Sequence, residues 1–222
     1  MAVALRTDET ARGQRSRLLA AMGDVVAAKG YAAATVADVV RAAGVSRTTF
    51  YELFRSKEDC FLQAYRDGVD ALIDDVRAAV RATEGDWREQ LRAGMRAYLA
   101  SLADDRRFAR TYLLEIHGAG EAALDARADA LRRFADRYHA TYEQARSGDP
   151  SLREPSADAL LVLCSGTEQL VAERLRRDEP IADLEDVFCT CAEAVLLHRP
   201  NPQPPYEKCQ APCQAPDDYR EP

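Results

Sequence analysis

The sequence predicts an all-α protein of about nine helices. Apolar residues recur every three or four positions along most of the chain, which is the spacing of one helix face. No segment shows the alternation of apolar and polar residues that is typical of a strand. Capping residues stand before several apolar runs and glycines stand after some of them, as at helix ends. We therefore expect a set of packed helices without a sheet.

Composition places the chain among ordinary soluble proteins. Its 222 residues are 47% hydrophobic and 30% charged, with a net charge of −7. The N-terminus reaches a charged residue too early for a secretory signal, and no apolar run approaches the roughly 18 residues of a membrane span. We expect a cytoplasmic protein. Residues 1–66 hold ten Lys/Arg and seven Asp/Glu, so a basic N-terminal part precedes an acidic remainder, a distribution that favours docking of one end on a polyanion.

The first helix is predicted over about residues 12–29. Leu18, Met22 and Val26 lie on one face at helical spacing, and Gly30 follows as a stop signal. The preceding residues 1–11 are expected to form a loose arm, and Arg6 with the nearby Arg12, Arg15 and Arg17 makes this part of the chain basic. The helix should pack across the next two helices and complete a three-helix head.

Two short helices joined by a tight turn are predicted between Thr35 and Lys57. Thr35 and Asp38 have the spacing of a capping box, which starts the first of them. Gly44 can adopt the left-handed conformation that ends it. Ser46 is a good N-cap for the second, over residues 47–54.

The second of these helices has an apolar side and a polar side. Phe50, Leu53 and Phe54 face inward, which leaves Arg47 and Tyr51 on the outside with Thr48. Eight helical residues span about 12 Å, similar to the width of the DNA major groove. These features are those of a recognition helix. The DNA-binding candidates are Thr35, Ser46, Arg47, Thr48, Thr49, Tyr51 and Lys57.

This stretch resembles the DNA-binding domain of the TetR family of transcriptional repressors. The resemblance rests on T-V-x-D-V, A-G-V-S-R-T-T-F-Y and S-K-E-D, and it covers about residues 12–65. It implies a homodimer that binds a palindromic double-stranded DNA operator and is released by a small, largely apolar effector held in the helical body. Arg47, Thr48 and Tyr51 would then read bases, and Thr35, Thr49 and Lys57 would contact phosphates.

A second capping box, Ser56 with Asp59, opens a long helix that leads from the head into the body. Further helices are predicted around the apolar positions from Trp87 to Leu102, over 108–116, around the apolar positions from Leu124 to Tyr142, and over about 156–177 and 184–198. Seven of the ten prolines lie in residues 199–222, which predicts a disordered Pro-rich tail. The expected domains are a helix-turn-helix domain over 1–56, a ligand-binding and dimerisation domain over 57–198, and the tail.

Aromatic residues on neighbouring body helices indicate either an ordinary core or an apolar pocket with a few polar groups. We favour a pocket, because several of these residues are tyrosines whose hydroxyls need partners when buried. The effector-binding candidates are Trp87, Met95, Tyr98, Tyr112, Glu115, Phe134, Tyr138 and Tyr142.

The last two helices are apolar over more than a narrow stripe. In the resembling family the last two helices of each chain form a four-helix interface, so we expect the dimer contact here, with Val187 and Phe188 at its centre. The dimer candidates are Leu163, Thr167, Leu170, Leu184, Val187, Phe188, Cys191 and Val195.

Catalytic and metal-binding patterns are not found in the sequence. The histidines show no metal-ligand spacing, the six cysteines lack the common zinc spacing, and no glycine-rich phosphate loop occurs. We therefore expect no enzyme, no metal site and no cofactor. Two alternatives stay open: a helix-turn-helix regulator controlled by a partner protein rather than by a small molecule, and a helical interaction protein that no longer binds DNA.

Overall fold

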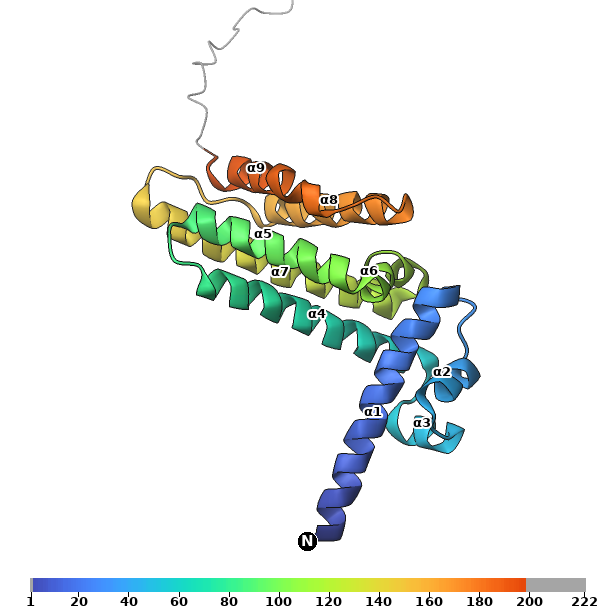
Figure 1. Cartoon of the computed structure of the whole chain (residues 1–222). Helices are drawn as coiled ribbons and strands as arrows, with labels where there is room; N and C mark the ends of the chain where they lie inside the picture. The colour runs from blue at the N-terminus through green and yellow to red at the C-terminus, as the bar shows by residue number, and fades with distance from the viewer. Residues whose placement is uncertain (1, 199–222) are drawn as a thin grey trace, which may run out of the picture.

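The chain is described by a computed structural model over residues 2–198 (Figure 1). These residues contain nine α-helices and two short 3-10 helices, and no strand. In order they are α1 (Ala2–Lys29), α2 (Val36–Ala43), α3 (Arg47–Leu53), α4 (Lys57–Ala82), α5 (Trp87–Asp104), α6 (Arg106–Leu113), η1 (Glu115–Gly118), α7 (Glu121–Gly148), α8 (Ala157–Arg176), η2 (Ala182–Leu184) and α9 (Glu185–Leu196). The predicted all-α fold is confirmed.

Helices α1–α3 form the head, and the local signals that predict α2 and α3 act as expected. The Thr35 hydroxyl accepts from the Asp38 N–H, and the Asp38 carboxylate accepts from the Thr35 N–H, which completes the capping box of α2. Gly44 ends α2 in the left-handed conformation, with φ of 63°. The Ser46 hydroxyl accepts from the Thr49 N–H at 3.0 Å and starts α3.

Helix α1 begins at Ala2, ten residues before the predicted start at residue 12. The prediction of a loose arm over residues 1–11 is therefore wrong. The segment contains no proline or glycine before Gly13, and Ala2, Ala4, Leu5, Arg6 and Ala11 are good helix formers. Alanine marks an apolar stripe only weakly, so a prediction that relied on that stripe began the helix too late.

Helix α4 links the head to the body (Figure 1). The Ser56 hydroxyl caps it by accepting from the Asp59 N–H at 3.0 Å. The Asp59 carboxylate accepts from the Arg55 N–H at 2.9 Å rather than from Ser56, so only half of the second capping box forms. Beyond this start, α4 buries Phe61, Tyr65 and other apolar residues as far as Val76.

In the body, α8 and α9 lie together on one side, α4 lies on the opposite side, and α5 and α7 lie between them (Figure 1). The predicted helix over 108–116 is split into α6 and the 3-10 turn η1. One continuous apolar core runs from Leu18 in α1 through α4 and α6 to Phe188 in α9. A second core joins α5, α7, α8 and α9 around Tyr142.

Two sequence expectations concern other parts of the chain. The Pro-rich tail, residues 199–222, lies outside the described residues. Within the part that the structure describes, no helix is both long and apolar enough to cross a membrane.

Candidate functional site

The outer face of α3 is the first candidate site. Phe50 and Phe54 are buried against α1 and α2, which turns the opposite side of the helix to solvent. Arg47 and Thr48 are exposed there, and Tyr51 is 49% exposed although it is a large aromatic residue. The Arg47 guanidinium donates to the Tyr51 hydroxyl at 3.4 Å and lies 5.6 Å from the centre of its ring. The pair therefore presents hydrogen-bond donors and an aromatic ring together on the outer face of the helix.

Three hydroxyl residues near this face are already engaged in capping. The Ser46 and Thr49 hydroxyls lie 2.9 Å apart, and the Thr35 hydroxyl donates to the Asp38 carboxylate at 2.5 Å. Ser46 and Thr35 are exposed and Thr49 is half-buried. Their first role is to hold the ends of α2 and α3 in place, and any phosphate contact would be added to that role.

Lys57 is placed differently from the prediction. Its ammonium group donates to the Tyr31 carbonyl at 2.9 Å and to the Ala34 carbonyl at 3.1 Å, and it lies 4.1 Å from the centre of the Tyr31 ring. Two of its three donors are used inside the head, because the start of α4 abuts the turn between α1 and α2 and directs the side chain inward. The phosphate contact predicted for Lys57 therefore stays a prediction that rests on its remaining donor.

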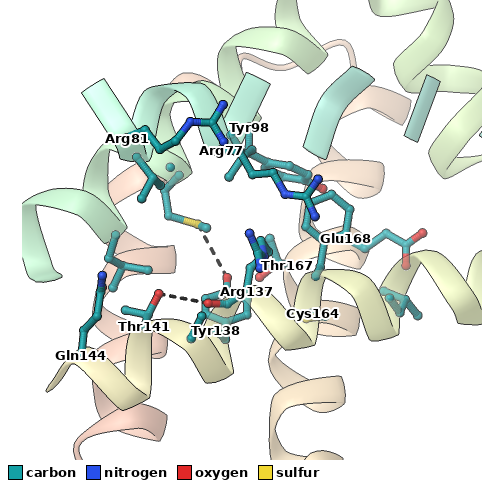
Figure 2. A pocket seen from close by; sticks show the side chains of 18 of the residues that line it. Arg77, Arg81, Tyr98, Arg137, Tyr138, Thr141, Gln144, Cys164, Thr167 and Glu168 are labelled. Atoms are coloured by element: carbon teal, nitrogen blue, oxygen red, sulfur yellow. Dashed lines mark hydrogen bonds between the residues drawn. The ribbon is translucent and has the colours of Figure 1, made fainter. Parts of the chain in front are cut away.

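The second candidate site is a cavity of about 360 Å³ in the body, between α4, α5, α6, α7 and α8 (Figure 2). Its walls are mainly apolar. Five of the eight predicted effector-binding residues line it together: Met95, Tyr98, Tyr112, Phe134 and Tyr138. A Tyr98–Phe134 edge contact, with ring centres 5.7 Å apart, joins α5 to α7 across the cavity.

The other three predicted residues lie elsewhere. Trp87 is the first residue of α5 and lines a separate groove beside Leu152, with Arg88 stacked on its ring. Tyr142 is fully buried in the second core, where its hydroxyl donates to the Leu152 carbonyl. Glu115 in η1 faces the head. Sequence spacing selected the correct helices here, but the ends of those helices extend past the cavity.

The rim of the cavity is polar, and the sequence prediction missed it. Arg81 and Gln144 are exposed, and Arg77 and Arg137 are half-buried, so these residues mark the opening between α4 and α7. Their spacing is the signal that could have found them: Arg77 and Arg81 follow the apolar residues Val76 and Val80 by one position each. They therefore lie at the edge of the same helix face.

The floor of the cavity contains a buried charge. Cys164, Thr167 and Glu168 of α8 line it, and Glu168 is only 3% exposed. The Glu168 carboxylate accepts from Arg127 of α7 through both oxygens, at 3.0 and 2.5 Å. Burial raises the pKa of Glu168, and the Arg127 guanidinium opposes that shift.

The tyrosines around the floor stay protonated. Burial raises the pKa of Tyr98, and the nearby Glu168 charge raises it further. The pKa of Tyr112 is raised mainly by burial as well. The floor is thus a set of neutral hydroxyls beside one neutralised ion pair.

The predicted dimer residues divide into two groups. One group is buried within the single chain: Leu163, Thr167, Leu184 and Phe188. These residues pack in the core of their own chain and do not lie on a surface that a partner could contact, which differs from the prediction. Leu170 and Val195 are half-buried, and Cys191 is exposed. Val187 is 47% exposed, and Val162 of α8, which the prediction missed, is 72% exposed. Both helices are apolar on more than one side, and the sequence could not tell which side faces their own chain.

Comparison with known proteins supports the head most strongly. Residues 18–64 match the family described as "Bacterial regulatory proteins, tetR family". The chain is 33% identical over 131 residues to the HTH-type transcriptional activator FasR of Mycolicibacterium smegmatis, covering 54% of this chain and 59% of that protein. It is 37% identical over 92 residues to the HTH-type transcriptional regulator AlkX of Mycobacterium tuberculosis, covering 41% and 43%. The chain thus spans less than two thirds of either relative.

Solved structures share the whole fold at low sequence identity. The fatty acid degradation regulator FadR from Bacillus halodurans superposes with a TM-score of 0.73 at 20% identity, covering 84% of this chain and 97% of that one. FadR from Bacillus subtilis, solved in complex with stearoyl-CoA, gives 0.71 at 17% identity, covering 80% and 96%. These structures resemble the chain over both its head and its helical body, and the resemblance is one of fold.

Proposed function

We propose that this chain is a ligand-responsive transcriptional regulator of the TetR family, whose family model matches its head over residues 18–64. It binds a palindromic operator as a homodimer, and a small, largely apolar effector in the body cavity releases it. The observation that carries the proposal is the outward Arg47–Tyr51 pair on a short α3 whose N-terminus is capped by Ser46. Because the operator is bacterial DNA, we propose that the protein acts in the cytoplasm. The proposed DNA-binding domain is residues 1–56, and the proposed effector-binding and dimerisation domain is residues 57–198.

The cavity supports a ligand with a long apolar part and an anionic end. Apolar walls suit a hydrocarbon chain, and arginines at the rim suit a carboxylate or phosphate. The FadR structure that holds stearoyl-CoA is a neighbour in fold, and this ligand has both features. We therefore propose a fatty acid or its thioester as the effector class.

Helix α6 provides a physical connection from the cavity to the head. Its Tyr112 lines the cavity and stacks on Tyr65 of α4, with ring centres 5.5 Å apart. Its Arg107 pairs with Asp24 of α1 at 2.5 Å. Glu115, in the turn after α6, accepts from the Tyr31 N–H of the head at 2.8 Å. A ligand that displaces Tyr112 therefore acts on α1 and on the α1–α2 turn together.

The direction of regulation depends on where the operator lies relative to the promoter. The resemblance predicts a repressor, whereas the relative from Mycolicibacterium smegmatis is named an activator. Both directions use the same molecular event, which is a change in DNA affinity on ligand binding.

The proposal is tested by fluorescence anisotropy of the full chain on a labelled fragment of its own upstream DNA, with and without stearoyl-CoA. We expect salt-dependent binding that weakens when the thioester is added. Binding to DNA that no fatty acid or thioester alters would favour the alternative of control by a partner protein. Failure to prefer any DNA fragment would favour the interaction-protein alternative.

A further inference from the structure

The carboxylate at the floor of the cavity is not explained by an apolar ligand. Glu168 lies at the end of the cavity opposite Gln144 (Figure 2). Its partner Arg127 is on α7 and does not line the cavity, so the guanidinium neutralises the carboxylate from behind while the carboxylate remains part of the cavity wall. Burial of an ion pair is costly, and a purely apolar ligand would make no use of it.

Hydrogen-bonding capacity is left over at this end. A carboxylate has about four acceptor positions, and Arg127 fills one on each oxygen. Among the buried side-chain polar atoms of residues 11–198, the Tyr65 hydroxyl and the Thr111 hydroxyl have no partner. Tyr65 stacks directly behind Tyr112, and Thr111 precedes Tyr112 in α6. Neither residue lines the cavity, so the open acceptor positions of Glu168 are the hydrogen-bonding capacity that a ligand can reach.

The opening of the cavity, at the end away from Glu168, carries positive charge from arginines. Arg77 pairs with Asp74 at 3.2 Å, whereas Arg81 and Arg137 have no carboxylate partner within the described part of the chain. Many other arginines of this acidic chain are paired. Free guanidinium groups at the opening therefore favour an anion at the rim, and an anion at the floor would be repelled by Glu168.

We propose that the effector is an amphipathic acid that carries a hydroxyl group at its far end: its anionic group binds the arginine rim, and its hydroxyl donates to Glu168. The inference rests on the function proposed above and narrows its ligand class. A neutral hydroxyl fits better than an ammonium group, because Arg127 already neutralises Glu168 and a further cation would leave a net charge buried. A plain hydrocarbon end would leave the acceptor positions unused.

The first test compares two matched probes by calorimetry on the full chain: dodecanoic acid and 12-hydroxydodecanoic acid, with the 8- and 16-carbon pairs to cover chain length. A hydrogen bond to a buried carboxylate is expected to make the best hydroxy acid bind at least about tenfold tighter than its plain counterpart. Equal or weaker binding of the hydroxy acid at every length would overturn the proposal, and so would failure of all these acids to bind.

The second test removes the carboxylate without leaving Arg127 unpaired. The double variant Arg127→Met/Glu168→Leu replaces the ion pair with apolar residues close to it in size, a change that proteins often tolerate. The double variant should then prefer the plain acid: the hydroxy acid should bind at least about fivefold more weakly than the plain acid of the same length, because its hydroxyl has lost its acceptor. Glu173→Gln, on the same helix but outside the cavity lining, is the control and should keep the wild-type preference. A double variant that keeps the wild-type preference would contradict the role of Glu168.

Parallel DNA measurements separate this inference from the proposed function. If the plain and hydroxylated acids bind equally and both release DNA, the proposed function stands and the hydrogen bond from a ligand hydroxyl to Glu168 is wrong. If the hydroxy acid binds tighter but neither acid changes DNA affinity, the hydrogen bond to Glu168 stands and the role of these acids as effectors is wrong.

Discussion

At the level of single residues, Arg47 and Lys57 show how two basic side chains in one motif acquire different tasks. Arg47 is exposed on the outer face of α3 and donates to Tyr51, four residues on. Lys57 is half-buried and donates to two carbonyls of the α1–α2 turn. Their sequence positions suggest DNA contacts for both, but the two side chains have opposite surroundings.

Arg47→Ala should weaken operator binding by about 1–3 kcal/mol and relax the preference at one base position, because a guanidinium in the major groove reads base edges. Anisotropy titrations against operators with single base changes measure both effects. Arg132→Ala removes an equally charged surface residue of α7 and should leave the preference intact. An unchanged preference in Arg47→Ala would show that α3 does not read bases through this residue.

Lys57→Met should lower the free energy of unfolding by roughly 1–3 kcal/mol, because the hydrogen bonds to the Tyr31 and Ala34 carbonyls are lost. The salt dependence of DNA binding should stay unchanged, whereas a lost phosphate contact would lower its slope by about one. Denaturant unfolding and DNA titration at several salt concentrations distinguish the two roles. A lowered slope without lost stability would instead support the predicted phosphate contact of Lys57.

Asp38 should make the stability of the head depend on pH in the acid range. A hydrogen bond from Lys29, at 2.6 Å, and another from the Thr35 hydroxyl lower the pKa of Asp38 to about 2. A carboxyl whose pKa is lowered by folding stabilises the protein above its unfolded pKa, so this contribution is lost as pH falls from about 4 towards 2. Asp38→Asn should make stability less dependent on pH in that window, as measured by thermal unfolding. An identical pH profile for the variant would rule out this contribution.

At the level of the elements, α6 is held between the cavity and the head. Its Phe108 stacks on Tyr112 and packs tightly against Gly68 of α4, where a Cβ atom would lie only 2.2 Å from the Phe108 ring. Two polar contacts then join α6 and η1 to the head, through Arg107 and Glu115. A helix with few degrees of freedom at both ends transmits a displacement rather than absorbing it.

Glu115→Ala should reduce the coupling between effector and DNA while leaving effector affinity in the absence of DNA nearly unchanged, because Glu115 touches the head and not the cavity. Glu115→Gln keeps an acceptor for the Tyr31 N–H and should retain the coupling. Coupling is reciprocal, and a tenfold factor corresponds to about 1.4 kcal/mol. Calorimetric titration of stearoyl-CoA with and without operator measures it; equal coupling in all three proteins would exclude this contact as part of the link.

At the level of the whole molecule, the outer face of α8 and α9 is suited to join two copies of the chain. Val162 and Val187 are exposed there, whereas Phe188 supports the core of its own chain. A two-fold contact through these helices would leave both heads free to reach two half-sites of a palindrome. Phe188→Glu is therefore expected to unfold the protein rather than to separate subunits.

Val162→Glu should shift the protein from dimer to monomer in sedimentation experiments and weaken binding to a two-half-site operator, because the partner copy would have to bury the new charge. Leu124→Glu is a matched control, since Leu124 is similarly apolar and 45% exposed but lies at the start of α7. It should leave the dimer intact. A Val162→Glu protein that remains dimeric would place the interface on another face.

Much of the fold and of the head could be predicted from the sequence, because the signals act over a few residues. Thr35 with Asp38, Gly44 and Ser46 set the ends of α2 and α3 through bonds to neighbouring backbone groups. The inward position of Phe50 and Phe54 follows from helical periodicity alone, and so does the outward position of Arg47 and Tyr51. The aromatic helices that enclose the cavity were also found in this way.

The chemistry of the cavity and the outer surface of the body were decided by tertiary structure. Arg127 and Glu168 are 41 residues apart, Lys57 and Tyr31 are 26 apart, and Glu115 and Tyr31 are 84 apart. Such contacts depend on how each helix is rotated about its axis and where it crosses its neighbours. Helices that are apolar on two sides, such as α8 and α9, do not encode that rotation in their spacing. The partners of Phe188 and the exposure of Val162 were therefore determined only when the helices packed against one another.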